Sequence, residues 1–112
     1  MENPLRGDVA LVIDGQRFVM RLTLGALAAL EARLESGSLM ELAERFETGQ
    51  IGAADLMALL AAGLMGGGHD LSESDLAKAE IEGGAVGALQ AGMTLLARAF
   101  QPFDDGLSLI HI

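Results

Sequence analysis

The residues in this sequence whose types and spacing come nearest to an active site are His69 and Asp70. A carboxylate beside an imidazole can orient the ring as a general base, which is half of many nucleophilic sites. The chain has no cysteine to act as the nucleophile, and Ser72 and Ser74 are better explained as helix-cap and first-turn residues. We therefore interpret His69 as a loop histidine with a structural role, and we predict that the protein is not an enzyme.

Two other patterns resemble binding sites, a glycine-rich loop and a set of potential metal ligands. Three glycines precede His69, but a phosphate-binding P-loop needs Gly-Lys-Ser/Thr where this chain has Gly-His-Asp, and an acidic residue there repels phosphate. We interpret residues 66–70 as a loop between helices. A metal site needs three or four ligands in a defined geometry, which His69, His111 and the scattered carboxylates do not supply. We expect no catalytic residue, no metal and no cofactor.

The charge and composition narrow the class of partner. Among 112 residues, 16 are acidic and 7 basic, which gives a net charge of −9. Nucleic acid and anionic membranes are disfavoured partners, because both are bound through Lys and Arg. The simplest explanation of the charge is solubility, and the alternative is steering toward a basic partner. Hydrophobic residues make up 51% of the chain, with no Trp or Tyr and four Phe, which is typical of one helix-rich domain.

The sequence also bears on localisation. It has no cysteine, which fits a reducing compartment, and residues 1–4 lack the basic-then-apolar layout of a signal peptide. The most apolar run, residues 56–65, is far shorter than the ~20 residues needed to cross a bilayer. We expect a cytoplasmic protein in which this run is a buried core helix.

Residues 8–21 have the pattern of a β-hairpin. Asp14-Gly15 suits a two-residue type I′ turn, because both central residues need a positive φ. Around that turn the apolar face pairs Ile13 with Gln16, Leu11 with Phe18 and Val9 with Met20. On the other face Asp8 lies opposite Arg21, and Val12 opposite Arg17, which allows a cross-strand ion pair between Asp8 and Arg21. A lone hairpin is marginally stable in water, so its apolar face must pack on the rest of the chain.

Helical periodicity follows the hairpin. It predicts helices over residues 24–35, 38–48, 53–65, 73–80 and 85–100. Thr23 suits an N-cap, and Ser38 with Glu41 and Ser72 with Asp75 form capping boxes. The third helix carries a single charge, so we expect it to be the most buried. The predicted fold is α+β, with an N-terminal β-hairpin packed on a bundle of four to five short helices.

The last helix carries an apolar stripe that either packs inward or contacts another chain. The stripe comprises Val86, Leu89, Met93, Leu96 and Phe100. The methionines are most simply core filler, and the alternative is an adaptable groove for partner peptides. We assign residues 1–103 to one domain. Residues 104–112 end in an apolar run that is a flexible tail, a partner-docking peptide or a foreign sequence.

The order of these features resembles the gene transfer agent family of small phage-tail proteins. The resemblance spans residues 3–100 and rests on five motifs besides the hairpin: Asn3-Pro-x-Arg-Gly7, the run from Arg21 to Glu31, Leu42-Ala-Glu-Arg-Phe46, Asp55-Leu56 with the following Leu/Ala run, and Gly68-His-Asp70. Members of this family are encoded in the tail module of phage-like particles of alphaproteobacteria. The family is described both as tail tube proteins and as tail assembly chaperones.

The resemblance implies a role in tail assembly. As the main hypothesis we expect a non-enzymatic chaperone or adaptor that binds the tape-measure protein or other tail proteins, with homo-oligomerisation left open. The alternative is a structural tail tube component that is incorporated in the particle. A tube subunit usually needs a larger β-sandwich than one hairpin, which favours the chaperone. The candidate partner-binding surfaces are the outer edge of the hairpin and the stripe residues Leu89, Met93, Leu96 and Phe100.

Overall fold

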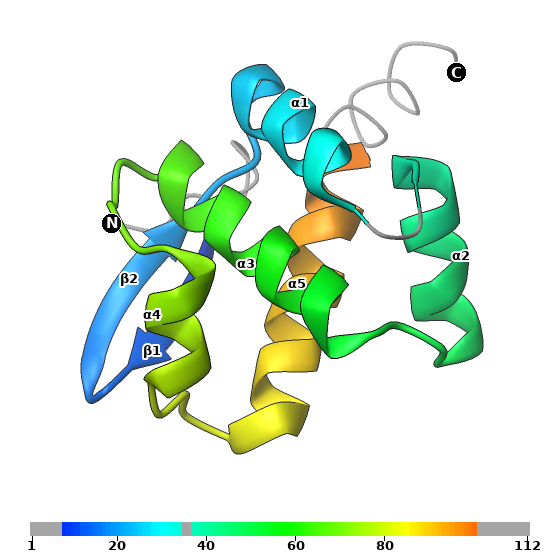
Figure 1. The fold of residues 1–112 in the computed structure, drawn as a ribbon. Coiled ribbons are helices and arrows are strands. Elements are labelled where there is room, and N and C mark those ends of the chain that lie inside the picture. The colour runs from blue at the N-terminus through cyan, green and yellow to red at the C-terminus, as the bar shows by residue number, and fades with distance from the viewer. Residues whose placement is uncertain (1–7, 35–36, 101–112) are drawn as a thin grey trace, which may run out of the picture.

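The computed structural model describes residues 8–34 and 37–100. Within these ranges a two-stranded antiparallel sheet precedes five α-helices, so the predicted α+β fold is confirmed. The elements are β1 (Val9–Ile13), β2 (Gln16–Met20), α1 (Leu24–Arg33), α2 (Leu39–Thr48), α3 (Ala53–Gly66), α4 (Glu73–Lys78) and α5 (Gly84–Phe100). In Figure 1 the hairpin lies on one side of α3 and α2 lies on the other, with α5 crossing behind α3.

The hairpin forms in the predicted register. Val9 pairs with Met20, and Ile13 pairs with Gln16 next to the turn. Asp14 and Gly15 both have positive φ, 51° and 80°, as a type I′ turn requires. The apolar face is buried against the helices: Val9, Leu11, Ile13 and Met20 are each at most 5% exposed. The requirement that the hairpin pack on the rest of the chain is therefore met.

Side-chain caps fix where three helices begin. The hydroxyl of Thr23 accepts a hydrogen bond from the Ala26 N–H, and the hydroxyl of Ser38 accepts one from the Glu41 N–H. Ser72 and Asp75 form the complete capping box, in which each side chain bonds the other residue's backbone N–H. These starts match the sequence prediction, because capping is a local interaction.

Two helices end earlier than predicted. α1 ends at Arg33, where Leu34 turns to an extended conformation; residue 35 lies outside the described ranges. α4 ends at Lys78 instead of Glu80, because both backbone groups of Glu80 bond elsewhere: its N–H donates to Asp14 Oδ1 and its C=O accepts from the Asp14 N–H. Because Glu80 is hydrogen-bonded to the hairpin turn, it is not part of the helix.

Helix α3 is the centre of the core, as its sequence predicted. It packs against β2, α1, α4 and α5, and Leu59, Leu60 and Leu64 are at most 1% exposed. The single charged residue of the helix, Asp55, is only 4% exposed, which the sequence did not predict. Asp55 lies in the first turn of α3, where the helix dipole favours a negative charge.

The glycines at the end of α3 lie directly against β2. The helix continues through Gly66, so the prediction that residue 66 begins a loop was wrong. A Cβ atom added at Gly66 would lie 1.9 Å from the backbone oxygen of Arg21, and one at Gly67 would lie 2.0 Å from that of Val19. The Arg21 N–H also donates to the backbone oxygen of Gly63 at 2.8 Å. These glycines therefore permit close helix–strand packing.

Some predictions fall outside the described residues, namely those on residues 104–112 and on His111. Among the described helices none is by itself long and apolar enough to cross a membrane; α2 and α3 meet that criterion only as a pair, which is bent by 120°.

Candidate interaction surface

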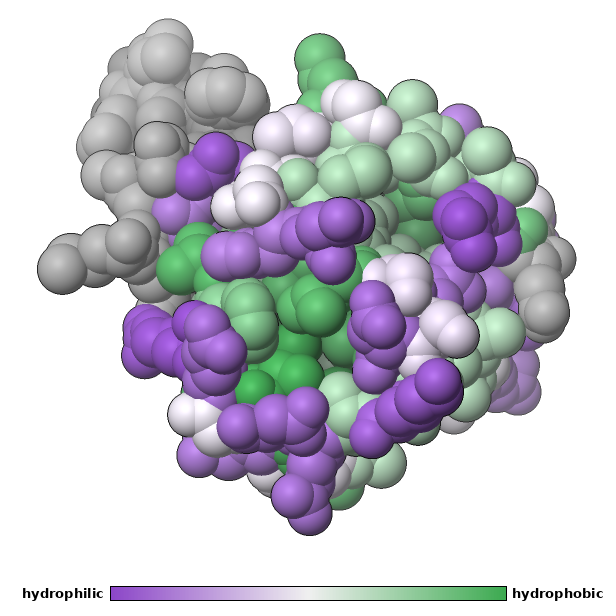
Figure 2. Space-filling model, turned by 60° about the vertical axis from the view of Figure 1, so that its left-hand side comes forward, coloured by the Kyte–Doolittle hydropathy of each residue, from purple (hydrophilic) through white to green (hydrophobic). Residues whose placement is uncertain are grey.

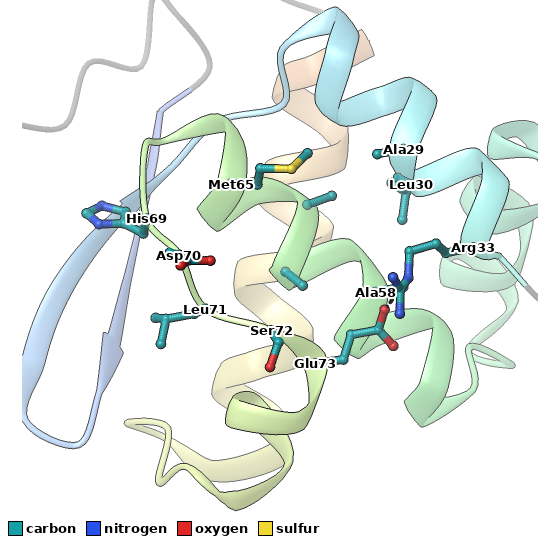
Figure 3. Close-up of a pocket in the computed structure, with 12 residues that line it drawn as sticks. Ala29, Leu30, Arg33, Ala58, Met65, His69, Asp70, Leu71, Ser72 and Glu73 are labelled. Carbon is teal, nitrogen blue, oxygen red and sulfur yellow. Dashed lines mark ion pairs between the residues drawn. The ribbon is translucent and has the colours of Figure 1, made fainter.

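His69 and Asp70, which suggested an active site, both line one pocket, but their side chains point in different directions. Figure 3 shows the His69 ring pointing toward the hairpin and the Asp70 carboxylate pointing away from it, into a pocket. The ring of His69 packs edge-on against Phe18, with 5.0 Å between centroids and an interplanar angle of 86°. His69 thus fills space between the loop and β2, which agrees with the interpretation of a structural loop histidine.

The pocket beside Asp70 is small, and four alanines are among its lining residues. Its volume is about 240 Å³, and it lies between α1, α3 and the loop before α4 (Figure 3). Arg33 Nε lies 2.6 Å from Glu73 Oε2 at its edge. Since the Arg33 side chain is 65% exposed, we expect this ion pair to contribute less than about 1 kcal/mol. Within the described ranges, no three His, Asp or Glu side chains gather closely enough to hold a metal ion.

A second hollow lies between α2 and α5, and we call it the α2–α5 groove. It is an open groove of about 420 Å³. In Figure 1, α2 stands at the edge of the molecule, where it buries only Leu42 completely. The groove is lined by Met40, Ala43, Glu44, Phe46 and Glu47 from α2 and by Met93, Leu96, Ala97 and Phe100 from α5.

The groove brings together three of the four predicted partner-binding residues. Met93 and Phe100 are 50% and 47% exposed, and Leu96 is buried at 4% between them. Leu89 is half-buried and does not line the groove. The stripe therefore packs partly inward and partly faces the groove, because the buried side of α5 is centred on Ala88, Gly92 and Leu95. Whether the groove binds a partner stays a prediction.

The α2 wall of the groove was not predicted from the sequence. Met40 is 70% exposed, and Ala43 and Phe46 are half-buried. A Cβ atom on Gly92 would lie 3.3 Å from Phe46 Cζ, so the missing side chain of Gly92 lets Phe46 approach α5. Helical spacing places Leu39, Leu42, Ala43 and Phe46 on one apolar face of α2, but the position of that face opposite α5 depends on tertiary packing.

The described methionines differ in burial, and Met57 is half-buried. Met20 is fully buried, as core filler should be, whereas Met40, Met65 and Met93 are at least half exposed. The interpretation of all of them as core filler was therefore wrong for these three. Met40 and Met93 line the groove from its two different helices, which matches the alternative of an adaptable surface.

The groove has an acidic wall. Glu44 and Glu47 lie among its lining residues, and no Lys or Arg does. Both glutamates are exposed. The nearest basic residue along α5, Arg98, instead donates from Nη1 to the backbone oxygen of Asp8. The groove therefore combines an apolar floor with a negative rim.

The outer edge of the hairpin is less open than expected. The Glu82 N–H donates to the backbone oxygen of Val12 at 3.0 Å, and the Asp14 N–H donates to that of Glu80 at 2.8 Å. The half of the β1 edge next to the turn is therefore already paired with residues 80–82. In Figure 2 the hairpin side is turned forward and shows hydrophobic side chains in the middle of that face, surrounded by hydrophilic ones.

A family model described as "Phage tail tube protein, GTA-gp10" matches residues 6–102 of the chain. No curated protein and no solved structure matches it. The match spans the hairpin, all five helices and the α2–α5 groove.

Proposed function

Because the chain belongs to the family of phage tail tube proteins described as GTA-gp10, we propose that it is a structural component of the tail of a phage-like particle. The family match over residues 6–102 is the observation that carries this proposal. It supports incorporation in the tail better than the assembly chaperone that we expected from the sequence.

The surface of the molecule is compatible with a role based on protein contacts. Met40, Met93 and Phe100 are large hydrophobic residues, each at least 47% exposed, and all three line the α2–α5 groove. Large exposed hydrophobic residues that gather in one place are typical of sites that another protein covers. In this proposal, neighbouring tail proteins cover the groove in the assembled particle.

Purified particles test the proposal. We expect quantitative mass spectrometry of mature, gradient-purified particles to find the chain at a constant molar ratio to the other tail proteins across preparations. A chain that is abundant in the cell lysate but absent from mature particles would rule out a structural component. Particles treated with protease and repurified serve as the control for loosely adsorbed protein.

An assembly chaperone is the second candidate, and one observation favours it. In the part of the chain that the structure describes, the sheet has only two strands, whereas a tube subunit usually builds its ring from a larger β-sandwich. A chaperone would be missing from mature particles and would co-purify with the tape-measure protein when both are expressed together. Co-purification together with absence of the chain from mature particles would favour this candidate, whereas co-purification with a constant amount in mature particles would favour the structural component.

We also propose that the protein is not an enzyme and that it acts in the cytoplasm, where such particles assemble. The packing of the His69 ring against Phe18 supports the proposal that the protein is not an enzyme. The variant His69→Phe keeps an aromatic ring in this contact but has no imidazole. We expect tail assembly with His69→Phe to equal that of the unchanged protein, and a loss of assembly without a loss of stability would contradict us.

A further inference from the structure

We propose that the α2–α5 groove binds an amphipathic α-helix of another tail protein, one whose apolar stripe is flanked by Lys and Arg. This inference rests on the proposed function in taking the partner to be a tail protein. The shape, hydrogen bonding and charge of the groove each contribute to the choice of occupant.

The length of the groove fits a short helical segment. Its α2 wall runs from Met40 to Glu47 and its α5 wall from Met93 to Phe100. Seven residue steps along a helix span about 10 Å, or roughly two turns. Two turns of a partner helix present apolar side chains at positions i, i+3 or i+4, and i+7. The groove can therefore hold about three anchor side chains.

Hydrogen bonding favours a helix over an extended strand. Both walls are α-helices, whose backbone groups are bonded within each helix except at the ends. A strand docked between them would find no backbone partners and would leave its own buried N–H and C=O groups unpaired, which is costly. A helix satisfies its own backbone and can bury an apolar stripe without that cost.

Charge selects a basic partner. Glu44 and Glu47 lie along the α2 wall without a cation among the lining residues, and the whole chain carries a net charge of −9. Lys or Arg on either side of the partner's stripe would face these carboxylates. A second copy of this chain is disfavoured, because apposing two grooves would bring four carboxylates together.

The methionines explain how the groove adapts to its occupant. Met40 and Met93 are unbranched, and both are at least half exposed on opposite walls. Flexible thioether side chains can repack around different anchor side chains. The groove is thus suited to a stripe of Leu, Ile or Met, without a single shape of pocket.

A pair of designed peptides tests the inference on the intact protein. Each peptide has about 18 residues, long enough to form a helix in complex, and the same leucine stripe, flanked by lysines in one peptide and by glutamates in the other. We expect the lysine peptide to bind at least about tenfold more tightly than the glutamate peptide, with NMR shift changes confined to α2 and α5. Equal binding of both peptides, or shift changes elsewhere, would overturn the inference.

Variants locate the binding and separate its two components. We expect Met93→Ser to weaken binding of the lysine peptide at least about tenfold. The matched control is Val86→Ser, because Val86 is also on α5 and is 64% exposed but does not line the groove. The double variant Glu44→Lys with Glu47→Lys should reverse the preference between the peptides. Weakening by Val86→Ser equal to that by Met93→Ser would contradict the assignment.

The outcomes separate this inference from the proposed function. If purified particles contain the chain but neither peptide binds the groove, the proposed structural role is supported and the inference about the groove is wrong. If the lysine peptide binds but mature particles lack the chain, the inference about the groove is supported and the proposed structural role is wrong. A protein that forms dimers at micromolar concentration, and loses them on Met93→Ser, would show that the groove serves a second copy and would overturn the inference.

Discussion

Arg21 donates a hydrogen bond from Nε to Asp8 Oδ1 at 2.7 Å, across the open end of the hairpin. The Asp8 side chain is fully buried, whereas that of Arg21 is 29% exposed. This hydrogen bond, together with the negative charge of Asp8, raises the pKa of Arg21 above its ordinary value. The backbone oxygen of Asp8 also accepts from Arg98 on α5. Asp8 therefore connects both ends of the hairpin to the last helix.

Removing the Asp8 carboxylate should destabilise the protein. We expect Asp8→Ala to lower the free energy of unfolding by about 2 kcal/mol, because a charged hydrogen bond is lost and a buried space opens. Urea denaturation at neutral pH measures this. The control is Glu31→Ala on the exposed surface of α1, for which we expect a change below about 0.5 kcal/mol. Equal effects of the two variants would mean that the Asp8–Arg21 pair does not stabilise the fold.

The pairing of Asp8 with Arg21 was predictable, but the burial of Asp8 was not. The hairpin register follows from the Asp14-Gly15 turn, which sets every cross-strand pair. Asp8 contacts Arg98, 90 residues away along the chain, and no local pattern in the sequence reports such long-range packing. The helix starts at Thr23, Ser38 and Ser72 were predictable for the same reason as the register, since a cap involves residues three positions apart.

The candidate groove likewise combines local features that the sequence predicts with a long-range contact that it does not predict. The stripes on α2 and α5 were each visible from helical spacing, but their meeting depends on the close approach of Phe46 to Gly92. Leu96 and Met93 belong to one stripe in sequence, yet one is 4% and the other 50% exposed. Periodicity identifies a face of a helix, and only the packed structure shows which part of that face is covered.

The packing of α3 on β2 gives a second stability prediction. We expect Gly67→Ala to lower the free energy of unfolding by at least about 2 kcal/mol, because the new Cβ would lie 2.0 Å from the backbone oxygen of Val19. A backbone atom cannot move aside as a flexible side chain can, so the strand or the helix end must shift. Thermal or urea unfolding measures the effect.

Gly25→Ala is the matched control for this packing. Gly25 lies within α1 and is exposed, and a Cβ there would lie 4.0 Å from Thr23 Oγ1. Alanine favours a helix over glycine by up to about 1 kcal/mol, so this variant should be neutral or stabilising. If Gly67→Ala were equally well tolerated, the close contact between α3 and β2 would be wrong.

The capping box at α4 predicts a dependence of stability on acid. The backbone N–H of Ser72 donates to Asp75 and, with the Ser72 hydroxyl and Lys78, lowers the pKa of Asp75 below its ordinary value. Between the pKa of Asp75 in the folded protein and its higher pKa of about 3.9 in the unfolded chain, the unfolded chain binds more protons. The stabilisation by ionised Asp75 is therefore present above the pKa of the unfolded chain, and it is lost as the pH falls through the pKa of the folded protein.

A comparison with Asp75→Asn isolates this contribution from those of the other carboxylates. We expect the unchanged protein to have the higher midpoint of thermal unfolding at pH 7. The difference between the two proteins should begin to shrink as the pH approaches the ordinary carboxyl pKa of about 3.9, and it should reach its minimum only below the lowered pKa of Asp75 in the folded protein. A difference that stays constant from pH 7 to strongly acid solution would contradict the ionised capping box.

The contact between the hairpin turn and the loop before α5 gives a final prediction. Asp14 Oδ1 accepts from the Glu80 N–H at 2.9 Å, and the Asp14 residue has a positive φ of 51°. Asp14→Ala removes the acceptor and places alanine in a conformation that it disfavours, so we expect a loss of about 1–2 kcal/mol in the free energy of unfolding. Asp14→Asn keeps an acceptor oxygen and tolerates this φ, so it should lower the free energy of unfolding by less than about 0.5 kcal/mol.

Hydrogen exchange measures the same contact locally. The Glu80 amide should exchange faster in the alanine variant alone, and equal exchange in both variants would mean that the Asp14 side chain does not hold residues 80–82 against β1.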